Sequence, residues 1–290
     1  MSNKTIFHGD HMKATENTPL FQTSLIFFFA IIACSKLAAH DFNGEAQYLG
    51  NAGILVTAKT KAAKINILFD PFFHRHFNTY TLVPDKVRKA IFAGEKPFNK
   101  IDAIFVSHAH GDHFSSQDVL AYLTAFPKTK LVAPKQAVDK ILELAGGDKL
   151  KSRLISVELA YKEKAKRFSV GEINIDAVRI PHAGWPARAN VENIVFRVRL
   201  SNDVIVMHLG DADPNRIHFQ QHRKLWEDQK TDLAFPPYWF YFSEEGKDIL
   251  DMQINAKNSV GIHVPTNIPK DLIKTSRDYF SNPGEVRQIK

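Results

Sequence analysis

The chain has 290 residues, of which 44% are hydrophobic and 24% are charged, the balance of an ordinary globular protein. Its length suits one large domain or two small ones, and the lack of repeats, heptads and low-complexity blocks excludes solenoid, coiled-coil and disordered classes. The formal net charge of +7 comes from scattered lysines and arginines. This pattern indicates a solvated basic surface, with attraction to anionic substrates or an anionic membrane surface as the alternative.

The first forty residues differ from the rest of the chain. Residues 25–33 form an almost uninterrupted apolar run, which has the length of a signal-peptide core and is short for a membrane span. Ala39 suits cleavage by a signal peptidase, whereas residues 31–34 resemble a bacterial lipobox that ends at Cys34. We therefore expect residues 1–39 to be a leader and residues 40–290 to be a single domain.

Such a leader would place the protein in the periplasm or tether it to a membrane through a lipid on Cys34. The region before the apolar run is poor for export, because its two lysines are offset by an aspartate and a glutamate, and a translation start at Met12 would shorten it. The alternative is a buried strand or helix in a cytoplasmic protein. Cys34 is the only cysteine, so residues 40–290 hold no disulfide and no thiolate ligand.

From Ala46 onward the chain alternates between strand and helix patterns without an obvious linker. Gly50 and Asn51 separate two short apolar runs, 46–49 and 53–57, and predict a hairpin. We expect further strands at 64–69, 101–107, 130–133, 153–158, 166–170, 173–180, 192–200, 203–209, 232–235 and 259–263. We expect helices at 84–94, 115–126, 135–144, 214–228, 244–255 and 269–279. The two groups of strands predict an α/β fold in which two sheets face each other with helices outside.

Three histidines and one aspartate follow the predicted strand 101–107 within six residues, in the order His108, His110, Asp112 and His113. Alternate side chains on extended chain share a face, so His108, His110 and Asp112 can converge on one point. The glycine at 111 lets the backbone bend and turn His113 toward a neighbouring point. Neutral imidazole and ionised carboxylate bind zinc, manganese or iron, so this segment predicts a metal site, with a histidine-rich polar loop as the alternative.

Further ligand candidates stand at the ends of later predicted strands. His182 follows the strand 173–180, Asp211 follows 203–209, and His263 ends 259–263. Each is weak evidence alone, because a histidine at a strand end is often only hydrogen-bonded structure and Asp211 could cap the helix after it.

Together with the motif, these residues resemble the metallo-β-lactamase-fold superfamily over residues 45–270. The resemblance implies a four-layer αββα sandwich with two adjacent metals. It assigns the first metal to His108, His110 and His182, the second to Asp112, His113 and His263, and a bridging role between them to Asp211.

The segments 48–54, 69–71 and 261–265 look like the branch that contains ascorbate-phosphate lactonase and N-acylphosphatidylethanolamine phospholipase D. Asp211 and the missing cysteine ligand argue against an antibiotic-resistance enzyme. His110 stands where the diiron oxygen- and nitric-oxide-reducing branch usually has glutamate. The extra recognition regions of the RNA-processing branches are not found, so we expect no nucleic-acid partner.

The ligand set implies a dinuclear hydrolase in which two divalent ions share a water, lower its pKa and make hydroxide the nucleophile. Zinc is the expected metal, and manganese and iron are compatible. We expect a small-molecule or lipid-like substrate, with a phosphodiester first and a lactone, other ester or amide second. A non-catalytic metal-binding or ligand-binding module is the remaining alternative, and nothing in the sequence indicates an oligomeric state.

Other side chains are candidates for supporting roles. Asp112 could also orient the hydroxide or relay its proton. Asp70 could accept a hydrogen bond from a ligand imidazole and fix its tautomer, or could simply be a turn residue. Trp185, Tyr238 and Trp239 could line a mouth for an acyl chain or ring, or could pack in the core.

Five further histidines are expected to be structural or exposed rather than ligands. His74 and His76 could sit over the metals, but a mobile surface loop is the preferred interpretation. His208 is expected inside a strand, and His218 and His222 on the solvated face of the predicted helix 214–228.

Overall fold

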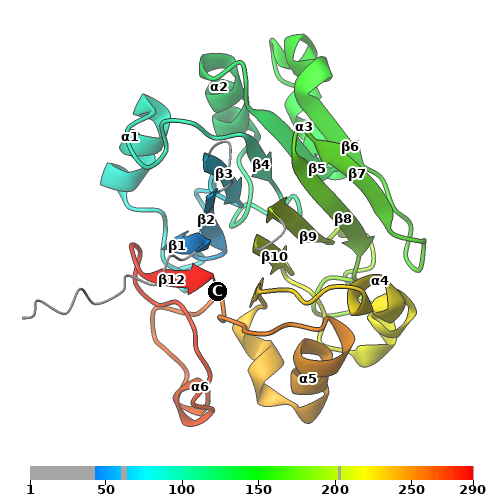
Figure 1. Ribbon diagram of the computed structural model, residues 1–290. Coiled ribbons are helices and arrows are strands. Elements are labelled where there is room, and N and C mark those ends of the chain that lie inside the picture. The colour runs from blue at the N-terminus through cyan, green and yellow to red at the C-terminus, as the bar shows by residue number, and fades with distance from the viewer. Residues whose placement is uncertain (1–42, 60–63, 202–203, 290) are drawn as a thin grey trace, which may run out of the picture. The chain divides into compact units, whose positions relative to one another are not determined.

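The computed structural model describes residues 43–59, 64–201 and 204–289 (Figure 1). They all belong to one compact unit, Asp41–Lys290. The predicted leader and Cys34 lie outside the described residues, so the leader and the domain boundary at residue 40 stay predictions. None of the helices in the described ranges combines the length and the apolar character needed to cross a membrane.

The first sheet contains, in the described part of the chain, seven strands in the order β12-β1-β2-β3-β4-β5-β6. The strands β1 to β3 pair antiparallel, as the predicted hairpin at Gly50 requires, and β3 to β6 pair parallel. Their bounds are β12 (Val286–Ile289), β1 (Gly44–Gly50), β2 (Gly53–Lys59), β3 (Lys64–Phe69), β4 (Ala103–Phe105), β5 (Lys130–Pro134) and β6 (Leu154–Val157). Parallel strands bring their carboxyl ends to the same edge of the sheet, which is where ligands bind in such sheets.

The parallel strands are connected through helices. These are α1 (Asp85–Ala93), α2 (Ser116–Ala125), α3 (Lys135–Leu142) and the 3₁₀ helix η1 (Gly147–Arg153). The helix α2 begins where the sequence predicts it, because the Ser115 side chain accepts a hydrogen bond from the backbone nitrogen of Asp118. The segment from β4 to this cap contains the histidine-rich motif, so the motif lies at a strand end and is fixed at both sides.

The second sheet has, among the described residues, the strand order β11-β10-β9-β8-β7. All neighbours pair antiparallel except β10 and β11, which are parallel. The bounds are β7 (Lys166–Val170), β8 (Ile173–Arg179), β9 (Ile194–Ser201), β10 (Val204–His208) and β11 (Leu233–Phe235).

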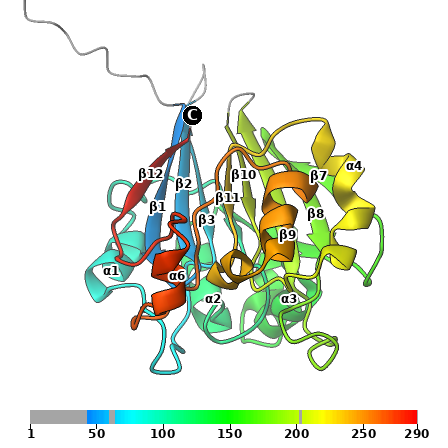
Figure 2. The ribbon, with the colours of Figure 1, turned by 90° about the horizontal axis from the view of Figure 1, so that it is seen from below.

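Apolar side chains define the layers. One buried cluster joins Val56 and Phe105 of the first sheet to Phe196 and Val206 of the second, so the two sheets face each other. A second cluster packs the other face of the first sheet against α1 to α3, and a third packs the second sheet against Trp226 and its neighbours. Figure 2 shows α1 beside the first sheet and α4 and α5 beside the second. This arrangement confirms the predicted αββα sandwich.

The structure differs from the sequence prediction mainly after Asp211. The expected helix 214–228 is divided into η2 (Arg216–His218), η3 (Gln220–His222) and α4 (Arg223–Glu227), and 244–255 is divided into α5 (Glu244–Asp248) and the π-helix η5 (Ile249–Gln253). The segment η4 (Tyr238–Phe242) holds the aromatic run, and α6 is only Lys270–Lys274.

The segment predicted as a strand at 259–263 forms isolated bridges instead, among them Ala234 with Ser259 and Pro237 with Ile262. The described chain also ends in a strand, β12, rather than in a helix. Both errors concern pairing between segments far apart in sequence, which short local patterns do not reveal.

Candidate metal centre

The seven predicted ligands stand where strands end between the two sheets. The motif follows β4, His182 follows β8, and Asp211 follows β10. An isolated bridge between His182 and Ala212 holds the ends of β8 and β10 side by side. His263 comes from the bridged segment after β11 and adopts a left-handed backbone conformation with φ of 61°.

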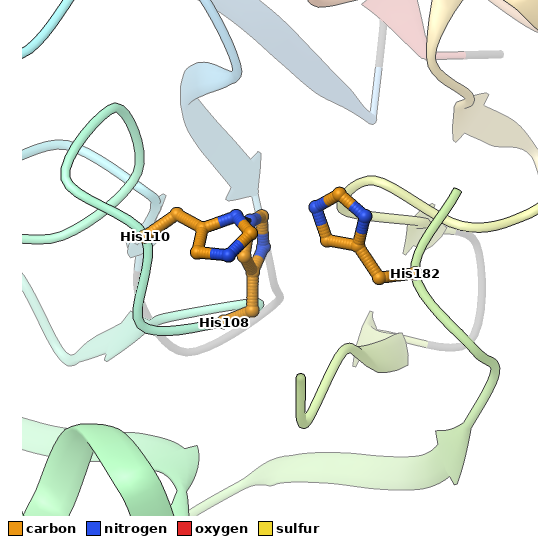
Figure 3. A group of neighbouring side chains, drawn as sticks. All are labelled: His108, His110 and His182. Atoms are coloured by element: carbon orange, nitrogen blue, oxygen red, sulfur yellow. Dashed lines mark hydrogen bonds between the residues drawn. The ribbon is translucent and has the colours of Figure 1, made fainter. Parts of the chain in front are cut away.

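The first group consists of His108, His110 and His182, which each offer a nitrogen within 4.8 Å of the others. Figure 3 shows His110 and His182 reaching the centre from opposite sides, with His108 between them. The nitrogens Nε2 of His108 and Nδ1 of His110 are 3.0 Å apart. His108 and His182 are buried, whereas His110 is half-buried, so this group is open to solvent on the side of His110.

The second group consists of buried side chains that also lie within 4.8 Å of one another, namely Asp112, His113, Asp211 and His263. His263 Nε2 is 3.2 Å from Asp112 Oδ2 and 3.3 Å from Asp211 Oδ2. His113 Nε2 is 3.2 Å from Asp211 Oδ1. Asp211 Oδ2 is also 3.4 Å from His182 Nε2. One carboxylate therefore contacts members of both groups.

The unsatisfied atoms of these side chains fit divalent cations. His113 Nε2, His182 Nε2 and Asp211 Oδ1 are buried without a hydrogen-bond partner. The other ring nitrogens of the two histidines already have partners, because His113 Nδ1 is 2.8 Å from Asp70 Oδ2 and His182 Nδ1 is 2.8 Å from the carbonyl of Ala183. When these rings are neutral, their lone pairs are therefore on Nε2, facing the centre. Buried polar atoms without partners are costly, and a metal ion would satisfy all three.

The protonation states favour metal binding at several positions. Burial lowers the pKa of His108 well below its usual value and lowers that of His110 to about 4, so both rings are neutral near pH 7. Burial acts to raise the pKa of Asp211, but the adjacent His113 and His263 hold it well below its usual range. Neutral imidazole and ionised carboxylate are the forms that ligate metals.

Asp70 stabilises the histidine-rich motif through hydrogen bonds to Ser107 and a contact with His113. Its Oδ1 accepts a hydrogen bond of 2.7 Å from the Ser107 backbone nitrogen, and its Oδ2 accepts one of 2.6 Å from the Ser107 hydroxyl. The same Oδ2 is the partner of His113 Nδ1. The fully buried Asp70 therefore fixes both the end of β4 and the ring of a candidate ligand.

Two asparagines that the sequence analysis did not single out position other ligands. The Asn51 side chain donates from Nδ2 to the backbone carbonyl of Asp112 at 2.8 Å. The Asn51 backbone carbonyl accepts a hydrogen bond from the backbone nitrogen of His263 at 3.0 Å. Asn193 Oδ1 accepts from the Asp211 nitrogen at 3.0 Å. The sequence shows the turn signal at Gly50-Asn51. It does not show that Asn51 contacts Asp112 and His263, which lie 61 and 212 positions further along the chain.

The backbone conformation and surroundings of position 210 require a glycine before Asp211. Its φ is +55°, and a Cβ there would lie 2.3 Å from Asn193 Oδ1. Only glycine combines this left-handed conformation with so close an approach. The Gly-Asp pair is therefore a steric requirement of the contact that holds Asp211.

A cavity of about 740 Å³ opens onto the ligand groups. Trp239 lines it, as expected, but Trp185 and Tyr238 lie outside its lining. The Trp185 ring packs instead against Tyr161 and His218, at centroid distances of 4.7 and 5.8 Å. Tyr238 packs against Trp239 and Phe242.

The cavity lining includes three residues that the sequence analysis missed, namely Arg75, Tyr80 and Arg188. The Tyr80 ring is 4.0 Å from the His263 ring, measured between centroids. These residues come from loops, where no periodic pattern marks the inward side chains.

The five histidines that were expected to be structural or exposed lie outside both ligand groups. His208 is buried in β10, with Nε2 2.9 Å from the Ala52 carbonyl. His74 is exposed and reaches Asp118 at 2.9 Å, and His76 is half-buried. The expectation that His218 and His222 are solvated is wrong, because both are buried. The broken helices η2 and η3 turn them inward.

The layered architecture and the strand-end clusters of histidine and aspartate define a metallo-hydrolase type of fold. Residues 65–261 match the family described as Beta-lactamase superfamily domain, and the chain belongs to that family. It is 24% identical over 246 residues to a metal-dependent hydrolase of Cupriavidus necator. The alignment covers 77% of this chain and 74% of that relative.

Solved structures agree on the fold. A metallo hydrolase from Ignicoccus hospitalis matches with a TM-score of 0.56 and 15% identity, over 85% of this chain and 98% of that one. An isothiocyanate hydrolase from Delia radicum gut bacteria matches with a TM-score of 0.53 and 13% identity, over 84% and 98%. The comparisons confirm the metallo-β-lactamase superfamily and support a metal-dependent hydrolase, while the branch stays a prediction.

Proposed function

We propose that the protein is a dinuclear, zinc-dependent hydrolase that cleaves a phosphodiester in a small or lipid-like molecule. The contact of Asp211 with both ligand groups carries this proposal. Its Oδ1 faces His113 of the second group, and its Oδ2 faces both His182 of the first group and His263 of the second. A carboxylate in contact with both groups is suited to bridge two adjacent cations.

The donor set supports zinc, because it consists of imidazole and carboxylate groups. His108, His110 and His182 would hold one ion, His113 and His263 would hold the other with Asp112, and Asp211 would join them. When bound, two such ions polarise the phosphoryl oxygen and lower the pKa of a water between them.

The chain's own residues then position the reacting groups. Asp112 lines the cavity and belongs to the second ligand group, so its carboxylate is placed to orient the attacking water and to receive its proton. Asp70 holds the His113 ring so that Nε2 faces the centre. The aromatic rings of Tyr80 and Trp239 limit solvent access near His263.

Charge favours a phosphodiester over a neutral ester. Two divalent cations would bring four positive charges to a ligand set whose carboxylates are Asp112 and Asp211 alone. The resulting positive excess attracts an anionic phosphoryl group and stabilises the charge that develops on it. A lactone or carboxylic ester uses the same water and metals but gains less from this excess.

The test uses protein reconstituted with zinc and compares bis(p-nitrophenyl) phosphate with a panel of lactones. We expect turnover of the phosphodiester to exceed that of each lactone. Faster hydrolysis of a lactone would contradict the substrate class but leave the two-metal site intact.

The substitution Asp211→Asn tests the bridging role. We expect it to lower kcat about a thousandfold or more and to reduce bound zinc from two ions per chain to one or fewer, because an amide is a poor bridging ligand. Circular dichroism would show that the fold is retained. The matched control is Asp271→Asn, whose exposed carboxylate pairs with Lys274, and full activity in Asp211→Asn would overturn the proposal.

A further inference from the structure

We propose that Arg75 and Arg188 form an anion-binding subsite beside the first ligand group, and that the natural substrate carries a second anionic group that occupies it. This inference rests on the proposed function, because it specifies the substrate of the same cavity. The second group is a carboxylate or a phosphate, separate from the phosphodiester that is cleaved.

Arg75 is held against the motif by its backbone and its stem. Its nitrogen donates to the Gly111 carbonyl at 3.0 Å. A Cβ added at Gly111 would lie 2.7 Å from Arg75 Cδ and 3.1 Å from its Cγ. The aliphatic stem therefore covers the backbone between His110 and Asp112, and the guanidinium is carried next to these ligands.

Arg188 lies beside the ring of His182 in the first group. Its backbone nitrogen donates to the Gly184 carbonyl at 3.3 Å, and its Nη1 is 3.4 Å from His182 Nδ1. This ring nitrogen already faces the Ala183 carbonyl at 2.8 Å, so it carries a hydrogen and gives the guanidinium no acceptor. Arg188 lies beside a ligand ring without being neutralised by it.

Neither guanidinium has a carboxylate partner within residues 43–59, 64–201 and 204–289, although both line the cavity. Both side chains are exposed. Arg197 and Arg88, by contrast, contact Asp176 and Asp118, each at 2.7 Å. A guanidinium presents a planar set of donors that matches a carboxylate or phosphate. Two such groups in one cavity without an internal acceptor indicate that the acceptor comes from the ligand.

The two arginines lie beside the three-histidine group. Arg75 packs on the backbone next to His110, Arg188 lies beside the His182 ring, and both arginines line the same cavity. The neighbourhood of His263 is aromatic instead, with the Tyr80 and Trp239 rings at 4.0 and 5.3 Å. The cavity thus offers cationic side chains beside the first group and aromatic rings beside His263.

This arrangement orients the substrate. The anionic group would lie at the arginines beside the first ligand group, the phosphodiester at the ligand groups, and an uncharged or aromatic portion against Tyr80 and Trp239. Binding energy from the arginines acts on a part of the substrate that does not react, so its loss should appear mainly in KM.

The first test uses two phosphodiesters that share a p-nitrophenyl leaving group. One carries a phenyl group and the other a para-carboxyphenyl group. We expect zinc-loaded protein to show a kcat/KM about tenfold higher for the carboxylated ester. In Arg75→Gln and Arg188→Gln this advantage should fall to less than about threefold, chiefly through KM. Arg223→Gln, on the exposed surface of α4, is the matched control.

The second test measures binding without turnover, by calorimetry with phenylphosphonate and para-carboxyphenylphosphonate. We expect the wild type to bind the carboxylated probe about tenfold tighter than phenylphosphonate. We expect Arg188→Gln to bind the two probes with equal affinity. Equal binding of both probes by the wild type would overturn the subsite even if the phosphodiester is cleaved. Preference for the carboxylated probe in a protein without phosphodiesterase activity would support the subsite and contradict only the proposed function.

Discussion

Asp70 shows how a single buried carboxylate can organise a candidate metal site from outside its two ligand groups. It receives two hydrogen bonds from Ser107 and contacts the Nδ1 atom of His113. The pKa of His113 is raised well above its usual value by Asp211 and Asp70, although burial acts in the opposite direction. The 2.8 Å contact between Asp70 Oδ2 and His113 Nδ1 indicates that His113 depends on Asp70 for its orientation.

The substitution Asp70→Asn should therefore weaken metal binding. An amide accepts a weaker hydrogen bond from His113, so we expect zinc affinity at the second group to fall about 10–100-fold, measured by competition with a chelator. Asp102→Asn is the control, since that carboxylate binds the Asn66 backbone away from the ligands. Equal affinity in wild type and Asp70→Asn would show that His113 is oriented by packing alone.

At the scale of elements, local patterns and long-range pairing differ in how well the sequence reveals them. The helices α1 to α3 and most strands are predicted within a few residues, because periodic apolar positions and the Ser115 cap are local. The strand β12 was missed because it is short and pairs with β1, more than 230 residues earlier. The candidate ligands were predicted from spacing, strand ends and the family resemblance, and their side chains lie together in the structure. Arg75 and Arg188, in contrast, are brought to the cavity by loops whose course no pattern gives.

The edge strand β12 is held to the core by one buried side chain. Ile289 is 1% exposed and packs between the sheets, whereas Val286 is 41% exposed. We expect Ile289→Ala to lower the free energy of unfolding in urea by about 2–3 kcal/mol, and Val286→Ala by less than about 1 kcal/mol. Similar losses in both variants would mean that β12 contributes through its backbone pairing only.

At the scale of the whole molecule, the candidate ligands come from both sheets. His108 and His110 follow β4 of the first sheet, and His182 and Asp211 follow strands of the second. Metal ions held by both would therefore join the two layers in addition to the apolar core. Ions that bind the folded chain more tightly than the unfolded chain stabilise the fold by mass action.

We accordingly expect zinc to raise Tm in a concentration-dependent manner, with a gain of about 3 kcal/mol in unfolding free energy at a hundredfold excess over Kd. A chelator should reverse the gain, and Asp211→Asn should retain less than the full effect. A Tm independent of zinc in the wild type would contradict metal binding across the two sheets.

The turn at Asn51 has a consequence for engineering the protein. Its side chain and its backbone together join Asp112 to His263, which are 151 positions apart in the chain. A redesigned or lengthened hairpin there would move two distant residues of the second group at once. That small bend is accordingly a place where the geometry of the centre could be adjusted without replacing any candidate ligand.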